Sequence, residues 1–184
     1  VGVPFAPVSS AYSLVSTDCE KLRYVVGLLT PGLVFAADGG KFGRAIGAVV
    51  PAGTEVVLTR GGIPGRKTTP LAALEARAAT AAVDHAHAAV GPDTIAKFLL
   101  TSGSTGNPKA VINTQRMLCS NMQMIAQTLP FVLDPAPVLV DWLPWNHTFG
   151  GNHNFSLVVY GGGTLYIDDG KPVPGLIEKT VRNL

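Results

Sequence analysis

The chain has 184 residues, of which 14% are charged and 47% hydrophobic, and its formal net charge is only +2. This composition excludes intrinsic disorder, because disordered segments are poor in apolar residues and rich in net charge. The sequence contains no run of Lys and Arg typical of nucleic-acid binding, no apolar stretch of the roughly 18 residues that would cross a bilayer, and no signal-peptide pattern at its N-terminus.

The first half of the chain alternates short apolar strands with helices. One helix is expected to begin at Thr17, because Thr17-x-x-Glu20 has the form of a capping box and apolar residues then recur at helical spacing. The expected order is strand 3–8, helix 17–29, strand 33–37, helix 41–50, strand 55–58, a polar loop at 60–70 and an Ala-rich helix at 71–90. Alternation of this kind predicts a parallel sheet with helices on its faces.

The second half follows a turn at Gly91-Pro92-Asp93. Its expected order is strand 95–100, strand 110–113, helix 114–129, strand 138–143, helix 155–160, strand 164–167 and an amphipathic helix that begins near 176. The predicted fold class is therefore α/β, with mostly parallel sheets flanked by helices. We expect two α/β halves, residues 1–92 and residues 93–184.

A cluster of hydroxyl groups and glycines follows the strand at 95–100. It consists of Thr101, Ser102, Gly103, Ser104, Thr105 and Gly106. Glycines allow backbone N–H groups to converge on an anion, hydroxyls add donors, and Lys109 supplies a positive charge nearby. These residues predict a phosphate-binding loop, although small polar residues also occur in plain surface loops.

Two other interpretations of this loop fail on its residues. A Walker A loop needs Gly directly before the Lys, and Pro108 stands there. A nucleophile elbow needs Gly two residues before its Ser, and Ser102 stands two before Ser104.

The second unusual segment is 141–154, which contains two Trp, two His and three Asn in fourteen residues after a predicted strand. Such a composition favours a binding surface over a connector, although Trp142 could equally belong to the core. Metal ligation is the competing interpretation. Its ligands would be His147 and His153 with Asp168 or Asp169, or would include His85 and His87. Without a Cys or a third closely spaced His, we expect no metal site there, and we expect His85 and His87 to be solvated.

The string 99–109, Leu-Leu-Thr-Ser-Gly-Ser-Thr-Gly-Asn-Pro-Lys, resembles the nucleotide-phosphate loop of the adenylate-forming superfamily, which includes acyl-CoA synthetases, luciferases and peptide-synthetase adenylation domains. The resemblance implies that Thr101 to Gly106 wrap the phosphates of ATP and that Lys109 holds the departing pyrophosphate. The family usually has Gly after the Lys, whereas this chain has Ala110, which would be strained if that position required a positive φ.

The segment 141–154 resembles the motif that follows the phosphate loop in this superfamily. Its detailed sequence, together with the sequences of 113–119 and 166–172, is similar to feruloyl-CoA synthases. The resemblance implies a two-step ligase that adenylates an aryl carboxylate such as ferulate and transfers it to CoA, with ATP, AMP and Mg²⁺ as cofactors. By motif match, His147 is the catalytic gate of the acyl pocket, beside Lys109 as the second catalytic residue. The implied pocket residues are Trp145, His147, Phe149 and Gly150.

Members of this superfamily are much longer and carry adenine, ribose and lid-domain motifs that this sequence lacks. We therefore expect a fragment of the large N-terminal domain, inactive alone and prone to self-association through exposed apolar surface. The alternative is a stand-alone phosphate- or nucleotide-binding module. Cys19 and Cys119 have no CxxC partner, which favours free thiols in a reducing, cytoplasmic compartment.

Overall fold

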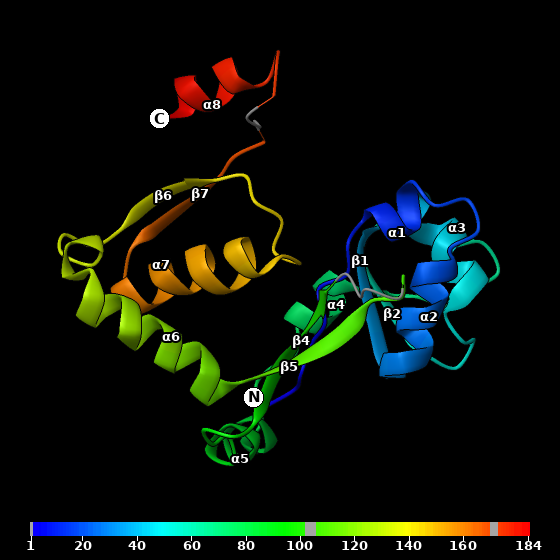
Figure 1. Ribbon diagram of the computed structural model, residues 1–184. Coiled ribbons are helices and arrows are strands. Elements are labelled where there is room, and N and C mark those ends of the chain that lie inside the picture. The colour runs from blue at the N-terminus through cyan, green and yellow to red at the C-terminus, as the bar shows by residue number, and fades with distance from the viewer. Residues whose placement is uncertain (1, 102–105, 170–172) are drawn as a thin grey trace. The chain divides into compact units, whose positions relative to one another are not determined.

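The structure, a computed structural model, describes residues 2–101, 106–169 and 173–184 (Figure 1). Its contacts divide the chain into two compact units. Unit 1 takes the described residues of Val1–Pro7, Ala89–Leu100 and Val111–Leu184, and unit 2 takes those of Val8–Ala88 and Thr101–Ala110.

Unit 2 contains a three-stranded parallel sheet in the order β1-β2-β3. The strands are β1 (Leu33–Asp38), β2 (Glu55–Arg60) and β3 (Thr69–Pro70). The helices are α1 (Ala11–Leu14), α2 (Glu20–Leu29), α3 (Gly39–Val49), α4 (Leu71–Glu75) and α5 (Ala81–Ala88). β1 pairs with β2 from Leu33↔Glu55 to Asp38↔Arg60, so the predicted parallel pairing is confirmed.

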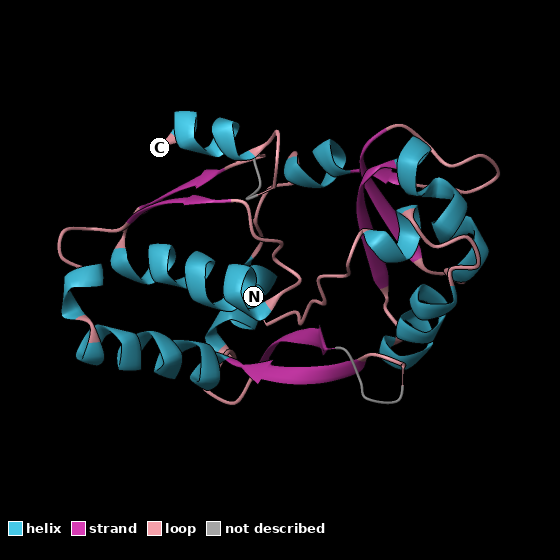
Figure 2. Cartoon of the chain, turned by 45° about the horizontal axis from the view of Figure 1, so that its top comes forward, coloured by secondary structure: helices cyan, strands magenta, loops and turns pink. Residues whose placement is uncertain are grey.

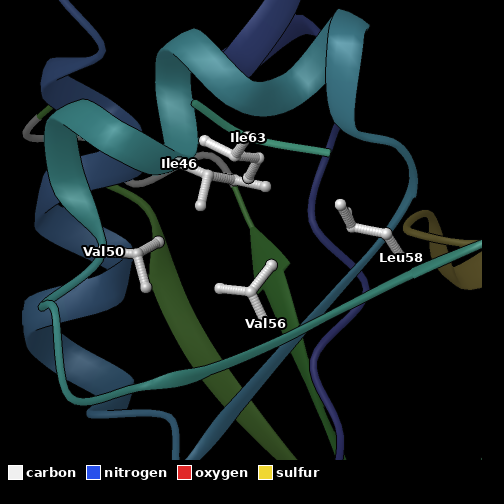
Figure 3. Packing of buried hydrophobic residues seen from close by; sticks show 5 residues of the cluster. All are labelled: Ile46, Val50, Val56, Leu58 and Ile63. Atoms are coloured by element: carbon white, nitrogen blue, oxygen red, sulfur yellow. The ribbon is translucent and has the colours of Figure 1, made fainter. Parts of the chain in front are cut away.

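The core of unit 2 lies between α3 and the sheet. Its buried members are Ile46, Val50, Val56, Leu58 and Ile63. Figure 3 shows Ile46 of α3 directly beside Ile63, with Val56 of β2 facing the same interior. A second buried cluster of Cys19, Leu22 and Ala45 joins α2 to α3. The apolar spacing predicted for the helix at 17–29 therefore matches the buried face of α2, which carries Leu22 and Val25.

Three predictions for the first half were wrong. The strand at 3–8 is reduced to a single bridge between Phe5 and Lys97. The capping box does not form, because α2 begins at Glu20 and its entry is held by Ser16 Oγ and Asp18 Oδ1, which accept the N–H groups of Cys19 and Glu20 at 3.0 and 3.1 Å. The Ala-rich helix is interrupted between α4 and α5. Neither piece has a buried residue, so no packing selects one continuous helix.

Unit 1 contains two strand pairs. β4 (Ile95–Thr101) and β5 (Lys109–Thr114) are hydrogen-bonded neighbours, although Thr101 and the first two residues of β5 group with unit 2. β6 (Val138–Asp141) and β7 (Thr164–Ile167) form a parallel pair (Figure 2). The helical elements are α6 (Gln115–Thr128), the 3₁₀ turn η1 (Pro130–Val132), the π-helix η2 (Phe149–Asn154), α7 (Phe155–Gly161) and α8 (Ile177–Asn183).

The helices of unit 1 are largely the predicted ones. α6 begins where Thr114 Oγ1 accepts the N–H of Met117, and α7 packs against both α6 and β7. The strand predicted at 138–143 ends at Asp141, because the Asp141 carboxylate accepts the Leu143 N–H at 2.9 Å and bends the chain toward Pro144. The π-helix before α7 was not predicted. None of the described helices combines the length and apolarity that a bilayer crossing requires.

Candidate functional site

The described ends of the predicted phosphate loop sit on neighbouring strands. Thr101 is the last residue of β4, and Lys109 is the first residue of β5. Gly106 has φ +90°, a conformation that favours glycine, so the turn back into β5 depends on that residue. Ser102, Gly103, Ser104 and Thr105 lie outside the described residues. The described part therefore has the strand-loop-strand form that the sequence predicted.

The side chain of Lys109 is exposed and makes no hydrogen bond or ion pair with any described residue. Its ammonium is thus available to an anion from solvent. The next residue, Ala110, continues β5 and is not among the described residues with positive φ. Replacement of the usual Gly by Ala therefore introduces no backbone strain here.

His147 ends a tight turn in the second predicted segment. Its N–H donates to the Pro144 carbonyl at 3.0 Å, and its own carbonyl accepts the Gly151 N–H at 2.9 Å. The Phe149 N–H donates to His147 Nδ1 at 3.3 Å. This last bond requires an unprotonated Nδ1, so Nε2 carries the proton of the neutral ring. The side chain is exposed and oriented by its own backbone.

Two buried glycines let η2 fold back against this turn. A Cβ on Gly150 would lie 2.9 Å from the Pro144 carbonyl oxygen, and a Cβ on Gly151 would overlap the Trp145 carbonyl oxygen. Any side chain at either position would push η2 away from the turn. The Gly150 of the predicted pocket is therefore required for packing, whatever else it contacts.

The aromatic side chains of the segment remain largely accessible. Trp145 is 44% exposed and packs at 5.1 Å between ring centroids against Phe155, while Phe149 is 52% exposed and lies 5.0 Å from the His153 ring. Trp142 is 36% exposed and follows β6, so of its two predicted positions the structure favours the accessible surface over the core. Exposed aromatic surface of this kind suits a flat or apolar ligand.

Lys97 is a residue of this region that the sequence analysis missed. It lies on β4 with 5% of its surface exposed, and its Nζ donates to the Gly151 carbonyl at 2.8 Å. Nζ also lies 5.9 Å from the centre of the Phe5 ring. Burial lowers the pKa of the Lys97 ammonium below its ordinary value. The available signal was one charged residue inside an otherwise apolar strand.

The carboxylates that were considered as metal ligands have other partners. Asp168 accepts the Thr180 hydroxyl and the Asn183 amide, and Asp169 pairs with Lys179. Within the described ranges, no group of three or more His, Cys, Asp or Glu side chains could hold a metal ion. His85 and His87 are exposed on α5, in unit 2, whereas His147 and His153 belong to unit 1.

The predicted site residues divide between the units. Thr101, Gly106 and Lys109 group with unit 2, and the implied acyl-pocket residues group with unit 1. The structure brings together Trp145, His147, Phe149 and Gly150, which lie in one turn and the start of η2.

A comparison with protein families decides what these two motifs belong to. The sequence profile of the AMP-binding enzymes matches residues 2–183. The chain belongs to the AMP-binding enzyme family. It shares with that family the α/β fold of parallel sheets flanked by helices, which corresponds to part of the N-terminal domain of adenylate-forming enzymes.

Two curated relatives of this AMP-binding chain are ligases. A putative ligase of Mycobacterium tuberculosis, Rv1013, is 44% identical over 61 residues, which are 33% of this chain and 11% of the relative. The medium-chain-fatty-acid–[acyl-carrier-protein] ligase TtuA of Teredinibacter turnerae is 39% identical over 75 residues, which are 41% of this chain and 11% of TtuA. The matched segments thus span about a tenth of either relative.

Solved structures agree on the fold. ATP-bound MatB from Rhodopseudomonas palustris matches with a TM-score of 0.60 and 23% identity over 90% of this chain and 30% of MatB. A malonyl-CoA ligase with methylmalonyl-CoA and AMP bound matches with a TM-score of 0.56 and 23% identity, over 90% of this chain and 30% of that enzyme. These structures share their fold with the AMP-binding chain, which spans about a third of their length.

Proposed function

We propose that this chain is the phosphate-loop portion of an ATP-dependent acid–thiol ligase. In the proposed reaction a carboxylate attacks the α-phosphate of ATP to give an acyl adenylate and pyrophosphate, and a thiol then displaces AMP to give a thioester. The observation that carries the proposal is the loop between β4 and β5, which ends in a glycine at φ +90° and a free, exposed Lys109.

The residues present suit the triphosphate. A positive side chain and converging donors neutralise the charge that develops on a leaving pyrophosphate. Lys109 would supply the charge, and Thr101 with the loop up to Gly106 would supply donors. Mg²⁺ would be held chiefly by the phosphates themselves, since the described residues offer no cluster of metal ligands. When bound, the metal would neutralise further phosphate charge.

The acid partner forms the finer part of the proposal. We place the acyl side of the site at Trp145, His147, Phe149 and Gly150, and we propose an aryl acid of the hydroxycinnamate type, such as ferulate, with CoA as thiol. Supporting this choice are the exposed faces of Trp145 and Phe149, which a flat ring could cover. The names of the relatives point instead to fatty acids and malonate, so the acid must be tested against both.

The test is acid-dependent exchange of labelled pyrophosphate into ATP, measured on the whole polypeptide that the gene encodes. Ferulate, octanoate and malonate are compared, with Lys109→Ala as the disabled variant and Lys67→Ala, an exposed loop lysine, as the control. We expect exchange with ferulate and its loss in Lys109→Ala alone. Exchange with octanoate or malonate only would refute the aryl acid, and no exchange with any acid would refute the ligase.

The alternative is a stand-alone phosphate-binding module, because both strands that flank the loop, β4 and β5, belong to this chain. Calorimetric titration of residues 1–184 with ATP separates the two. As a ligase portion, the chain should bind ATP weakly and form no thioester. Micromolar affinity would favour the module.

Three further expectations belong to this proposal. Residues 1–92 and 93–184 would be the two α/β halves of a partial AMP-binding N-terminal domain. The chain would work in the reducing cytoplasm, in keeping with the free thiols of Cys19 and Cys119. Exposed apolar side chains such as Phe131 and Ile167, at 70% and 74%, would drive self-association of residues 1–184, and a clean monomer in sedimentation at high concentration would count against it.

A further inference from the structure

Lys97 is a buried charge without a counter-charge among the described residues. Its Nζ has one hydrogen-bond partner, the Gly151 carbonyl at 2.8 Å, and one aromatic neighbour, Phe5 at 5.9 Å. Withdrawing an ammonium from water is costly unless it is paired and hydrogen-bonded. An apolar residue of similar length would avoid that cost, so the bond to Gly151 is the feature that a lysine adds here.

The acceptor of that bond belongs to η2, the only π-helix among the described elements. π-helical turns are uncommon and concentrate at functional sites. The Trp145 carbonyl lies close to Gly151, where there is no room for a Cβ, and the Gly151 N–H donates to the His147 carbonyl. One residue thus links Lys97 to the turn that carries His147.

A second tether joins η2 to the same strand pair. Asn152 Nδ2 donates to Asn113 Oδ1 at 2.9 Å, and Asn113 is buried on β5, where its own amide donates to the Val111 carbonyl. Successive residues of η2 are therefore bonded to side chains from β4 and β5. No comparable side-chain bond reaches Phe149 or His147 from outside their own segment in the described part of the chain.

We propose that Lys97 is a positioning residue of the acyl side. Through the Gly151 carbonyl it holds η2 in its π-helical form, and with Asn113 it fixes the orientation in which Phe149 and His147 meet the acid. This inference rests on the proposed function for its consequence in catalysis, but not for its structural content. Charge-assisted hydrogen bonds are about twice as strong as neutral ones, which suits a bond that must hold an uncommon turn.

The first test uses residues 1–184 and needs no activity. In Lys97→Met, which keeps the length of the side chain and removes the donor, we expect faster hydrogen exchange at 145–154 and unchanged exchange in β1 and β2. Lys97→Arg should restore part of the protection, because it keeps a donor and a charge. Lys21→Met, at an exposed position of α2, is the matched control. Exchange at 145–154 that is identical in Lys97→Met and the unaltered chain would overturn the proposal.

The second test measures kinetics on the whole gene-encoded polypeptide. If Lys97 positions the acyl side, Lys97→Met should raise the KM for the acid by about tenfold, which corresponds to about 1.4 kcal/mol, and leave the KM for ATP nearly unchanged. A general loss of packing would change both constants together, and that result would overturn the positioning role. If the unaltered enzyme showed no acid-dependent exchange of pyrophosphate into ATP, the proposed function would be refuted. The hydrogen-exchange measurement on residues 1–184 would still test the positioning role of Lys97.

Discussion

The hydroxyl of Thr180 on α8 donates to the Asp168 carboxylate at 2.6 Å, and both residues are buried. Asn183, one turn later, donates to the other carboxylate oxygen at 2.5 Å. Asp168 follows β7 directly, and its N–H donates to the Asp141 carbonyl at the end of β6. A single residue, Asp168, thus joins α8 through its carboxylate to the ends of two parallel strands, which it links through its backbone.

Thr180→Val should loosen α8, because it keeps the shape of the side chain and removes the donor to a buried carboxylate. We expect a loss of about 1–3 kcal/mol in the free energy of unfolding, as is typical when a buried acceptor loses its partner. Denaturant unfolding and hydrogen exchange of 177–183 would measure it. Thr128→Val, at an exposed position near the end of α6, should change neither.

Lys97 should make the stability of the chain depend on pH. Burial lowers the pKa of its ammonium, so between the folded pKa and the unfolded value of 10.5 the unfolded chain binds more protons than the folded chain. The free energy of unfolding should then rise with pH in that window. The difference between the unaltered chain and Lys97→Met, followed by denaturant unfolding from pH 7 upward, isolates this contribution from other titrating groups. A difference that does not vary with pH would contradict the prediction.

Asp38 should contribute stability that acid removes. Its carboxylate accepts the Arg60 guanidinium at 2.9 Å and the Lys41 N–H at 3.1 Å, and these bonds hold its pKa below the ordinary value of 3.8, with Arg60 the larger cause. The contribution is present above the ordinary pKa and is lost as the pH falls through the lowered folded value.

The substitution Asp38→Asn removes the charge and keeps an N-cap acceptor for α3. The melting temperature of the variant should therefore fall below that of the unaltered chain at neutral pH and approach it in acid. Asp84→Asn, on the exposed α5, provides the control. If the melting temperature of Asp38→Asn were lower by the same amount at neutral and acidic pH, the loss of stability would come from the shape of the side chain and not from its charge.

Local sequence patterns predicted most of the strands, but they did not predict the side-chain hydrogen bonds between elements. The apolar runs at β1 and β7 located both strands, because short apolar runs of this length are typical of strands. The predicted capping box at Thr17 failed, because Ser16 and Asp18 offer competing oxygens one residue away on either side. No local rule ranks such neighbours.

In the candidate site, too, local sequence predicted one feature and tertiary contacts determine another. The unusual composition of 141–154 marked the turn at His147 without any knowledge of the fold. The role of Lys97 was not predicted, because a lone charged side chain in a strand ordinarily points to solvent and its hydrogen-bond acceptor lies 54 residues further along the chain. Only the tertiary structure shows that a side chain of β4 is bonded to the backbone of η2.

Gly151→Ala provides the sharpest test of the turn itself. The added Cβ would overlap the Trp145 carbonyl oxygen, which is backbone and cannot rotate away, so η2 or the turn must move. Overpacking of this kind typically costs about 1–3 kcal/mol. Both tryptophans of the chain, Trp142 and Trp145, lie in this segment, so a shift of their fluorescence should accompany the loss of stability.

Gly27→Ala on α2, where a Cβ meets nothing within 4 Å, should be neutral or stabilising by about 0.4–1 kcal/mol and leave the fluorescence unchanged. Unaltered tryptophan emission in Gly151→Ala would show that the turn does not depend on this close approach.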